Sequence, residues 1–314
     1  MRRKTDIYYN PYERLHDNQG RWFKCNFHVH EGESIAGTLT AYKKAGYDIV
    51  SISGQRELFE TQVLGESIEL CTFSGQEYIG KDGILSVGAN IFVTGTPQQA
   101  VDMCNARGGF TVACHPHLAP WLESPEVPVL HKDEIILLKG LTGIEIMNGC
   151  LTRTHWDGRA LGLSCAADFW DDMLSDGIAI RGFGGDDFHE MHDINVAWTD
   201  IYSDSNNWAD IYKAVCDGCL CVSTGLRLFK FELDGTTLTV SANYPFCVDN
   251  RIEYRFIGRD GHILSAQTGL NAIFAVDIDE PYIRVEAIGP DGAKLWTQSI
   301  LNRRIYGSSL PADK

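Results

Sequence analysis

The sequence predicts an α/β barrel followed by a small antiparallel β domain. Up to about Gly225, short apolar segments that suit buried strands alternate with amphipathic segments that suit helices, as in successive βα units. After Gly225 the segments become short and alternating, and turn pairs such as Asp260-Gly261 separate them. The 314 residues are enough for one large domain and a smaller one.

The expected elements follow one another in a regular order. Segments predicted as strands of the first region are 22–29, 47–53, 70–78, 84–93, 110–114, 143–148, 178–184, 195–202 and 219–224. Segments predicted as helices are 36–46, 56–68, 97–108, 158–177 and 207–218. This alternation favours a parallel sheet, and the number of strands suits a barrel over residues 1–225. The antiparallel strands predicted within residues 226–314 are 228–235, 236–243, 251–258, 262–267, 272–278, 282–289 and 293–300.

Charge and composition narrow the classes of partner. A net charge of -15 argues against general binding to nucleic acid or to an anionic membrane surface. No apolar run approaches the ~18 residues of a membrane helix, and the basic start of the chain lacks the apolar core of a signal peptide. We therefore expect a cytoplasmic protein, and a homo-oligomer stays open.

The ten cysteines are expected to be small buried residues rather than a disulfide framework. Cys216, Cys219 and Cys221 have a spacing that suits a metal site, but a fourth ligand would be needed nearby. The simpler interpretation, which we favour, has Cys216 ending a helix and the other two on one face of a strand.

Ionisable residues gather at the carboxyl ends of the predicted strands. In an α/β barrel these ends meet at one rim, where active sites are built. His28 and His30 are two apart on a strand, so their side chains face one space. The other residues at such ends are Glu77, His115, His117, Asp187 and His189.

A metal site is the simplest use for this mixture, since an uncompensated cluster of charges would be costly to bury. Histidines bonded to backbone in the core are the alternative for His28 and His30. Glu77 and Asp187 at matching strand ends favour metal ligation instead. Of Asp186 and Asp187, alternation points only one inward. The acidic run on the helix 158–177 is predicted to be a solvated face: Asp168, Asp171, Asp172 and Asp176.

Six segments carry a resemblance to a known family. In order and spacing, "NFHVHEGES", "GYDIVSISGQ", "FSGQEY", "VACHPH", "GIEIMNG" and "GGDDFH" resemble the motifs of the PHP (polymerase and histidinol phosphatase) family of metal-dependent phosphoesterases. The resemblance covers roughly residues 20–225. It implies a distorted seven-stranded (β/α) barrel of the TIM-like type, with up to three divalent metal ions.

The resemblance carries over to the ligands unevenly. It implies a complete first metal position made of His28, His30, Glu77 and Asp187. The second position would share Glu77 and use His115, but a further histidine expected soon after Glu77 is absent. The third position keeps only His189, since Ile35, Gly54 and Gln55 stand where other ligands would be.

These residues predict a metal-dependent hydrolase, most simply a phosphoesterase acting on a small phosphorylated metabolite or nucleotide. One Zn, Mn or Fe ion is expected, with a second left open, and it would activate water as the nucleophile. His189 and His115 are the candidate acid catalysts. Candidate substrate-binding residues are His117, Gln55 and Arg56. Arg56 and Arg153 are candidates to bind phosphate, with a solvated surface position as the alternative for both. The alternative is a PHP-like module that binds metal or ligand and has lost turnover.

Overall fold

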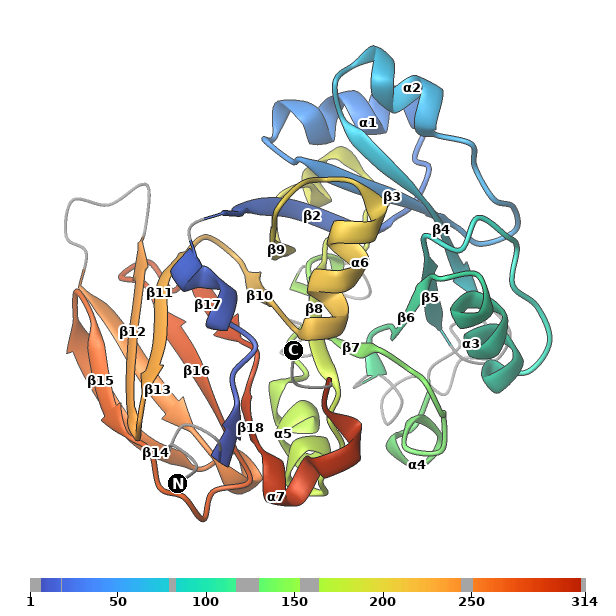
Figure 1. The fold of residues 1–314 in the computed structure, drawn as a ribbon. Helices are drawn as coiled ribbons and strands as arrows, with labels where there is room; N and C mark the ends of the chain where they lie inside the picture. Colours follow the sequence, from blue (N-terminus) through green and yellow to red (C-terminus); the bar gives the residue numbers. More distant parts are fainter. Residues whose placement is uncertain are drawn as a thin grey trace.

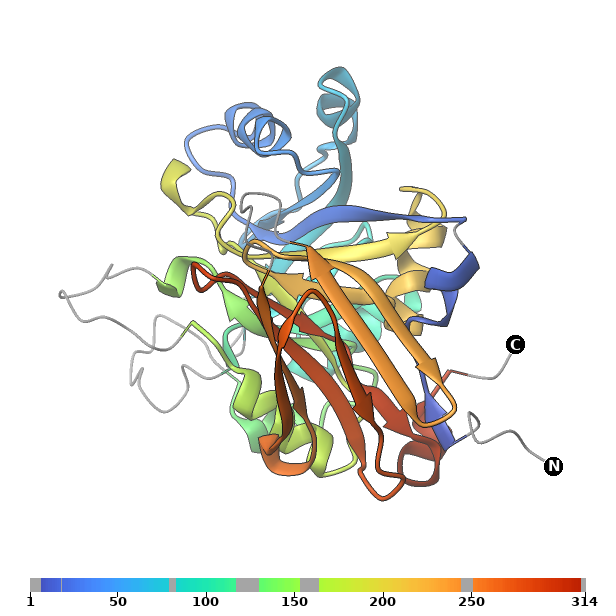
Figure 2. The ribbon, with the colours of Figure 1, turned by 90° about the vertical axis from the view of Figure 1, so that its left-hand side faces the viewer.

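The computed structural model describes residues 7–17, 19–78, 83–116, 130–152, 164–243 and 251–311. It is a mixed α/β protein with one large curled sheet and one small antiparallel sheet (Figures 1 and 2). None of the helices within these residues has the length and apolar composition needed to cross a membrane.

The region up to β10 supplies the strands around the candidate site and the helices that pack on them. The strands are β1 (Tyr8–Tyr9), β2 (Arg21–Val29), β3 (Ile49–Gly54), β4 (Cys71–Tyr78), β5 (Ile84–Val87), β6 (Phe110–Ala113), β7 (Gly143–Asn148), β8 (Arg181–Gly185), β9 (Trp198–Ser203) and β10 (Leu220–Ser223). The helices are α1 (Ile35–Lys44), α2 (Gln62–Ser67), α3 (Pro97–Ala106), α4 (Lys132–Ile135), α5 (Ala167–Ser175) and α6 (Trp208–Asp217), with short 3-10 segments η2 (Glu13–Asp17), η4 (Cys150–Thr152) and η5 (Met191–Asp193).

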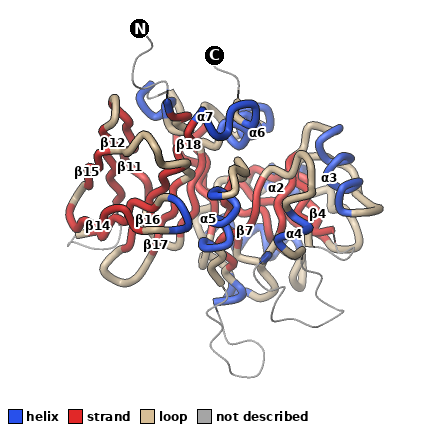
Figure 3. The backbone as a smooth tube through the Cα atoms, turned by 90° about the horizontal axis from the view of Figure 1, so that it is seen from below, coloured by secondary structure: helices blue, strands red, loops and turns tan. Residues whose placement is uncertain are grey.

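The remaining elements are mostly antiparallel strands. They are β11 (Arg227–Asp234), β12 (Thr237–Asn243), β13 (Ile252–Ile257), η6 (Arg259–Gly261), β14 (Ile263–Gly269), β15 (Ala272–Ala275), β16 (Tyr282–Ile288), β17 (Lys294–Thr297), β18 (Ile300–Asn302), α7 (Arg303–Tyr306) and η7 (Gly307–Ser309). Strands β11, β12 and β15 form the small sheet, while β17 pairs with β10 and so extends the large one. Figure 3 shows the strands that follow β10 lying beside the strands that precede it. The division into domains at residues 225 and 226 stays a prediction.

The large sheet is mixed rather than parallel. Strand β3 pairs in parallel with β2 and β4, and β7 with β6 and β8. In contrast, β5 is antiparallel to both of its neighbours, and β9 is antiparallel to β2 and β10. Only residues 79–83 connect β4 to β5, which is too short for the crossover that a parallel pair requires. The expectation of a parallel sheet was therefore wrong for these strands, and the structure does not confirm a TIM barrel.

The sheet curls until the end of β8 lies against β2 and β9. Val29 and Phe188 form an isolated parallel bridge, in which the His30 amide donates to the Phe188 carbonyl at 3.1 Å. Farther along, the Gly184 amide donates to the Thr199 hydroxyl at 2.9 Å. Because the sheet closes in this way, residues at the ends of β2 and β8 come close together although they are far apart in the sequence.

Helix α5 corrects one expectation about the acidic run. Asp172 and Asp176 have 59% and 61% exposed side chains, as a solvated face requires. Asp171, however, is buried and accepts two hydrogen bonds of 2.6 Å from the Arg284 guanidinium on β16. The prediction for Asp171 was wrong because its partner lies in a strand that helical spacing cannot identify. Within the described residues, this helix also begins only at Ala167.

The interpretation of the cysteines near residue 219 is confirmed. Helix α6 ends at Asp217, Gly218 caps it with a φ of 70°, and Cys219, which immediately precedes β10, and Cys221 within β10 are both buried. All cysteines within the described ranges are free thiols.

Lys24 and Asp200 face each other across β2 and β9. Lys24 is buried between the rings of Tyr47 and Trp198, with Nζ 4.1 and 4.0 Å from their centroids. Burial lowers the pKa of Lys24 to about 8 and raises the pKa of Asp200 to about 6. Each shift means that the folded environment disfavours the charged form of the residue. Ionising Lys24 or Asp200 therefore opposes folding.

Replacing Asp200 by asparagine should therefore change how stability depends on pH. Between pH 4 and pH 7 the folded chain retains a proton on Asp200 that the unfolded chain has released. Stability from that group is complete at low pH and is lost as pH rises through about 6. Relative to Asp200→Asn, the wild type should lose up to about 3 kcal/mol of unfolding free energy over this range, measured by urea denaturation. The surface variant Asp204→Asn keeps Asp200, so its unfolding free energy should depend on pH as that of the wild type does. If the difference in stability between the wild type and Asp200→Asn does not change with pH, the assignment to Asp200 is wrong.

Candidate metal centre

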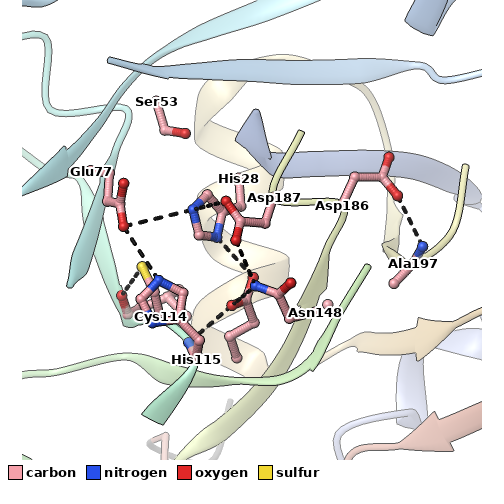
Figure 4. A network of polar contacts seen from close by, with 12 residues as sticks. His28, Ser53, Glu77, Cys114, His115, Asn148, Asp186, Asp187 and Ala197 are labelled. Atoms are coloured by element: carbon pink, nitrogen blue, oxygen red, sulfur yellow. Dashed lines mark hydrogen bonds and ion pairs between the residues drawn. The ribbon is translucent and has the colours of Figure 1, made fainter. Parts of the chain in front are cut away.

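The candidate site lies where the carboxyl ends of β2, β4, β6 and β8 meet. His28 and Glu77 are within β2 and β4. His30 directly follows β2, while His115 and Asp187 are the second residues after β6 and β8. All five residues are buried, with at most 7% of their surface exposed. Figure 4 shows four of them, His28, Glu77, His115 and Asp187, pointing into one space. The structure thus brings together the five predicted metal ligands.

Two carboxylates face the three imidazoles at short range. Oδ1 of Asp187 lies 3.0 Å from Nε2 of His28 and 3.1 Å from Nε2 of His30. Oε1 of Glu77 lies 3.8 Å from Nε2 of His28 and 3.4 Å from Nε2 of His115, and Oε2 lies 3.6 Å from Nε2 of His30. Nitrogen and carboxylate oxygen atoms therefore surround a common space, as the ligands of a divalent metal do.

Glu145 on β7 completes the cluster and was missed as a site residue in the sequence. Its Oε1 lies 3.0 Å from Nδ1 of His28, and its Oε2 accepts from the His115 amide at 3.0 Å and from Asn148 Nδ2 at 2.9 Å. A carboxylate at Nδ1 fixes the ring so that Nε2 faces the other ligands, which is the usual support of a metal-binding histidine. The feature of the sequence that could have identified it is a glutamate within the otherwise apolar strand "GIEIMN".

The charges of the cluster shift each other's pKa values. Burial disfavours the charged imidazole of His28, but Asp187 and Glu145 outweigh it and hold its pKa well above the usual value. Burial likewise opposes the ionised form of Glu77. The hydrogen bond with His115 and the charges of the neighbouring imidazoles outweigh this effect and lower the pKa of Glu77 to about 2. The Glu77 carboxylate therefore stays negative, and the imidazole protons are what a divalent cation would replace.

The residues present fit a metal ion. Nδ1 of His115 is buried and has no hydrogen-bond partner, which is rare for buried polar atoms. Of the groups of side chains with ligand atoms within 4.8 Å of one another, two lie in this cluster: His28, His30 and Asp187, and His28, Glu77, Cys114 and His115. Both groups are fully buried.

The backbone is unusual at two of these residues. Asp187 has a φ of 50° and His115 a φ of 31°, both in the region that favours glycine. Such conformations persist only where the surroundings hold them, and they concentrate at functional sites.

The ambiguity between Asp186 and Asp187 is resolved. Asp187 points into the cluster, whereas Asp186 points away from it and is fully buried (Figure 4). Its carboxylate accepts six hydrogen bonds of 2.8–3.0 Å, from Asn26 Nδ2, the hydroxyls of Tyr42 and Tyr47, and the amides of Asn195, Val196 and Ala197. Asp186 therefore holds the turn that presents Asp187.

A cleft of about 890 Å³ adjoins the cluster. His30, Gln55 and His189 are among its lining residues, together with Glu31, Gly32, Glu33, Phe188, Glu190, Met191 and His192. The side chain of His189 is 54% exposed, its Nδ1 donates to the Asp187 carbonyl at 2.8 Å, and its ring centroid is 4.5 Å from that of His30. His189 thus stands between the buried cluster and solvent.

The other candidate residues lie as follows. Gln55 donates through Nε2 to Oε2 of Glu77 at 2.8 Å, so it supports a ligand, and Arg56 beside it is exposed. Ile35 begins α1 and packs against a hydrophobic cluster. His117 and Arg153 lie outside the described residues.

The fold and this cluster define a mixed α/β protein with buried histidine and carboxylate groups that could bind metal. No family model matches the chain, and no curated protein matches it. Among solved structures, the chain is similar to a two-domain protein containing a predicted PHP-like metal-dependent phosphoesterase from Bacteroides vulgatus. The TM-score is 0.49 and the identity 12%, over 90% of this chain and 88% of that one.

Proposed function

We propose that this protein is a metal-dependent hydrolase, most simply a phosphoesterase acting on a small phosphorylated metabolite or nucleotide. The observation that supports it best is the buried set of three imidazoles and two carboxylates beside an open cleft. His28, His30, Glu77 and Asp187 would hold one divalent ion, and His115 would bind the second ion that is left open. We further propose that the curled sheet is a distorted (β/α)7 barrel of the PHP type. A location in the cytoplasm stays a prediction.

A bound divalent ion would supply an activated water molecule and polarise a phosphoryl oxygen. The chain's own residues would do the rest. Glu145 and Gln55 orient His28 and Glu77 through hydrogen bonds of 3.0 and 2.8 Å. His189 is accessible from the cleft, and its Nδ1–H is directed to a carbonyl, so Nε2 is the nitrogen left to exchange a proton with a leaving oxygen. Arg56, and His117 beyond the described residues, are the proposed substrate contacts.

Phosphate release from a broad panel of phosphoesters tests this proposal. Protein purified without a chelator should contain a divalent metal, and added Zn, Mn or Fe should support hydrolysis. His189→Ala should lower kcat by about 100-fold or more while bound metal stays unchanged, because this residue transfers a proton rather than binding the ion. The exposed His262 is the matched control, and His262→Ala should keep full activity.

The second candidate is a binding module that has lost turnover. Ile35 and Gln55 favour it, because neither side chain supplies the charged or imidazole ligand of a third metal. Bound metal without hydrolysis of any ester in the panel would select this alternative and contradict the enzyme.

A further inference from the structure

Cys114 lies next to the candidate metal centre. It directly follows β6 and is completely buried. Its Sγ lies within 4.8 Å of ligand atoms of His28, Glu77 and His115. In Figure 4 the sulfur lies between the carboxylate of Glu77 and the imidazole of His115. A thiol is therefore part of the same polar cluster as the histidines and carboxylates.

Glu77 lies between two groups of ligands. Its Oε2 is 3.6 Å from Nε2 of His30, on the side where Asp187 lies 3.1 Å from the same nitrogen. Its Oε1 is 3.4 Å from Nε2 of His115, on the side of Cys114. The two oxygens of one carboxylate thus face different neighbours, as they do when a carboxylate is shared by two ions.

A buried nitrogen atom without a hydrogen bond points to a ligand independently of the cysteine. Nδ1 of His115 is buried and has no hydrogen-bond partner. Nε2 of the buried His28 lies 3.0 and 3.8 Å from two carboxylate oxygens, those of Asp187 and Glu77. Cations among these nitrogen and oxygen atoms would satisfy such groups.

We propose that Cys114 is a ligand of the second metal position, the one that the resemblance implies at Glu77 and His115 and that shares Glu77 with the position made by His28, His30 and Asp187. This inference rests on the metal centre of the proposed function but does not require turnover. On binding, the S–H bond of Cys114 breaks, the sulfur donates its electron pair to the ion, and the proton passes to solvent. Three protein ligands leave one coordination position open, as in catalytic zinc sites.

The sulfur ligand sets the kind of metal. Thiolates prefer Zn²⁺, Fe²⁺ or Co²⁺ to Mg²⁺ and Mn²⁺, whereas imidazole and carboxylate alone accept a wider range. The second position should therefore select a thiophilic ion.

Titration of the chelator-stripped full chain with Co²⁺ tests the proposal. The wild type should bind two ions, and one of them should produce a thiolate-to-cobalt charge-transfer band in the near ultraviolet. Cys114→Ser should lose this band and one ion, and its Zn²⁺ affinity at that position should fall by more than about 10-fold. Cys104 is equally buried and contacts a different cluster, so Cys104→Ser should keep both.

The wild-type spectrum decides the question even if Cys114→Ser does not fold. Co²⁺ bound without the band, or a full band in folded Cys114→Ser, would overturn the second position. A band without hydrolysis of any phosphoester would leave this inference intact and contradict the proposed function. Hydrolysis without the band would support the proposed function and contradict this inference.

Discussion

Replacing Glu77 by glutamine should abolish tight metal binding while the chain stays folded. Glu77 is 4% exposed and faces His28, His30 and His115 at 3.4–3.8 Å, so it contributes charge to both proposed ion positions. Glutamine keeps the shape but removes the charge that offsets the cation. Loss of a residue that only orients a ligand weakens metal binding by 10- to 100-fold, so loss of this ligand should exceed about 100-fold. Any phosphoester hydrolysis should fall at least as far.

Thermal unfolding with and without metal measures this effect together with metal content. Metal at 100 times its dissociation constant should stabilise the wild type by about 2.7 kcal/mol, and Glu77→Gln should lose that stabilisation. Glu253, whose side chain is 40% exposed and paired with Arg255, provides the matched control, and Glu253→Gln should respond to metal as the wild type does. Unchanged metal content in Glu77→Gln would rule out the proposed centre.

Replacing Asp186 by alanine should unfold the chain whether or not metal is present. Six donors bind this buried carboxylate, three of them backbone amides of residues 195–197. Each donor left without a partner costs at least about 1 kcal/mol, so the total exceeds about 5 kcal/mol. That loss is comparable with the whole stability of many domains, about 5–15 kcal/mol.

The neighbouring residue provides the contrast. Asp187→Asn should keep the fold and lose metal, because Asp187 faces His28 and His30 rather than backbone donors. Asp204 is 46% exposed, and Asp204→Ala should change the urea midpoint little. Circular dichroism and urea denaturation with chelator present separate these cases. A natively folded Asp186→Ala protein with an unchanged urea midpoint would contradict the role assigned to Asp186.

Local rules were sufficient to predict several features of the site. Side chains two apart on a strand share a face, and the rings of His28 and His30 do lie 5.3 Å apart, between centroids. The end of α6 followed from Gly218 in the same way, because a left-handed residue ends a helix. Glu77 and Asp187 could be placed near these histidines because each falls at the end of a strand.

Other features depend on contacts between distant segments. Asp171 is separated by 113 residues from Arg284, so helical spacing alone predicted a solvated side chain. Glu145 was overlooked because nothing near it in the sequence shows that His28 Nδ1 lies 3.0 Å away. The antiparallel pairing of β5 with β6 likewise depends on which strands become neighbours.

The sequence by itself determined the chemical character of this protein: imidazole and carboxylate groups at strand ends, with period-two spacing that turns His28 and His30 to one side. Only the tertiary structure decided that Asp187 faces the cluster while Asp186 anchors the turn, and that Cys114 and Glu145 belong to the same site. The physical reason is the distance along the chain over which each effect acts. Strand and helix periodicity act over a few residues, whereas the curl of the sheet determines which strand ends meet.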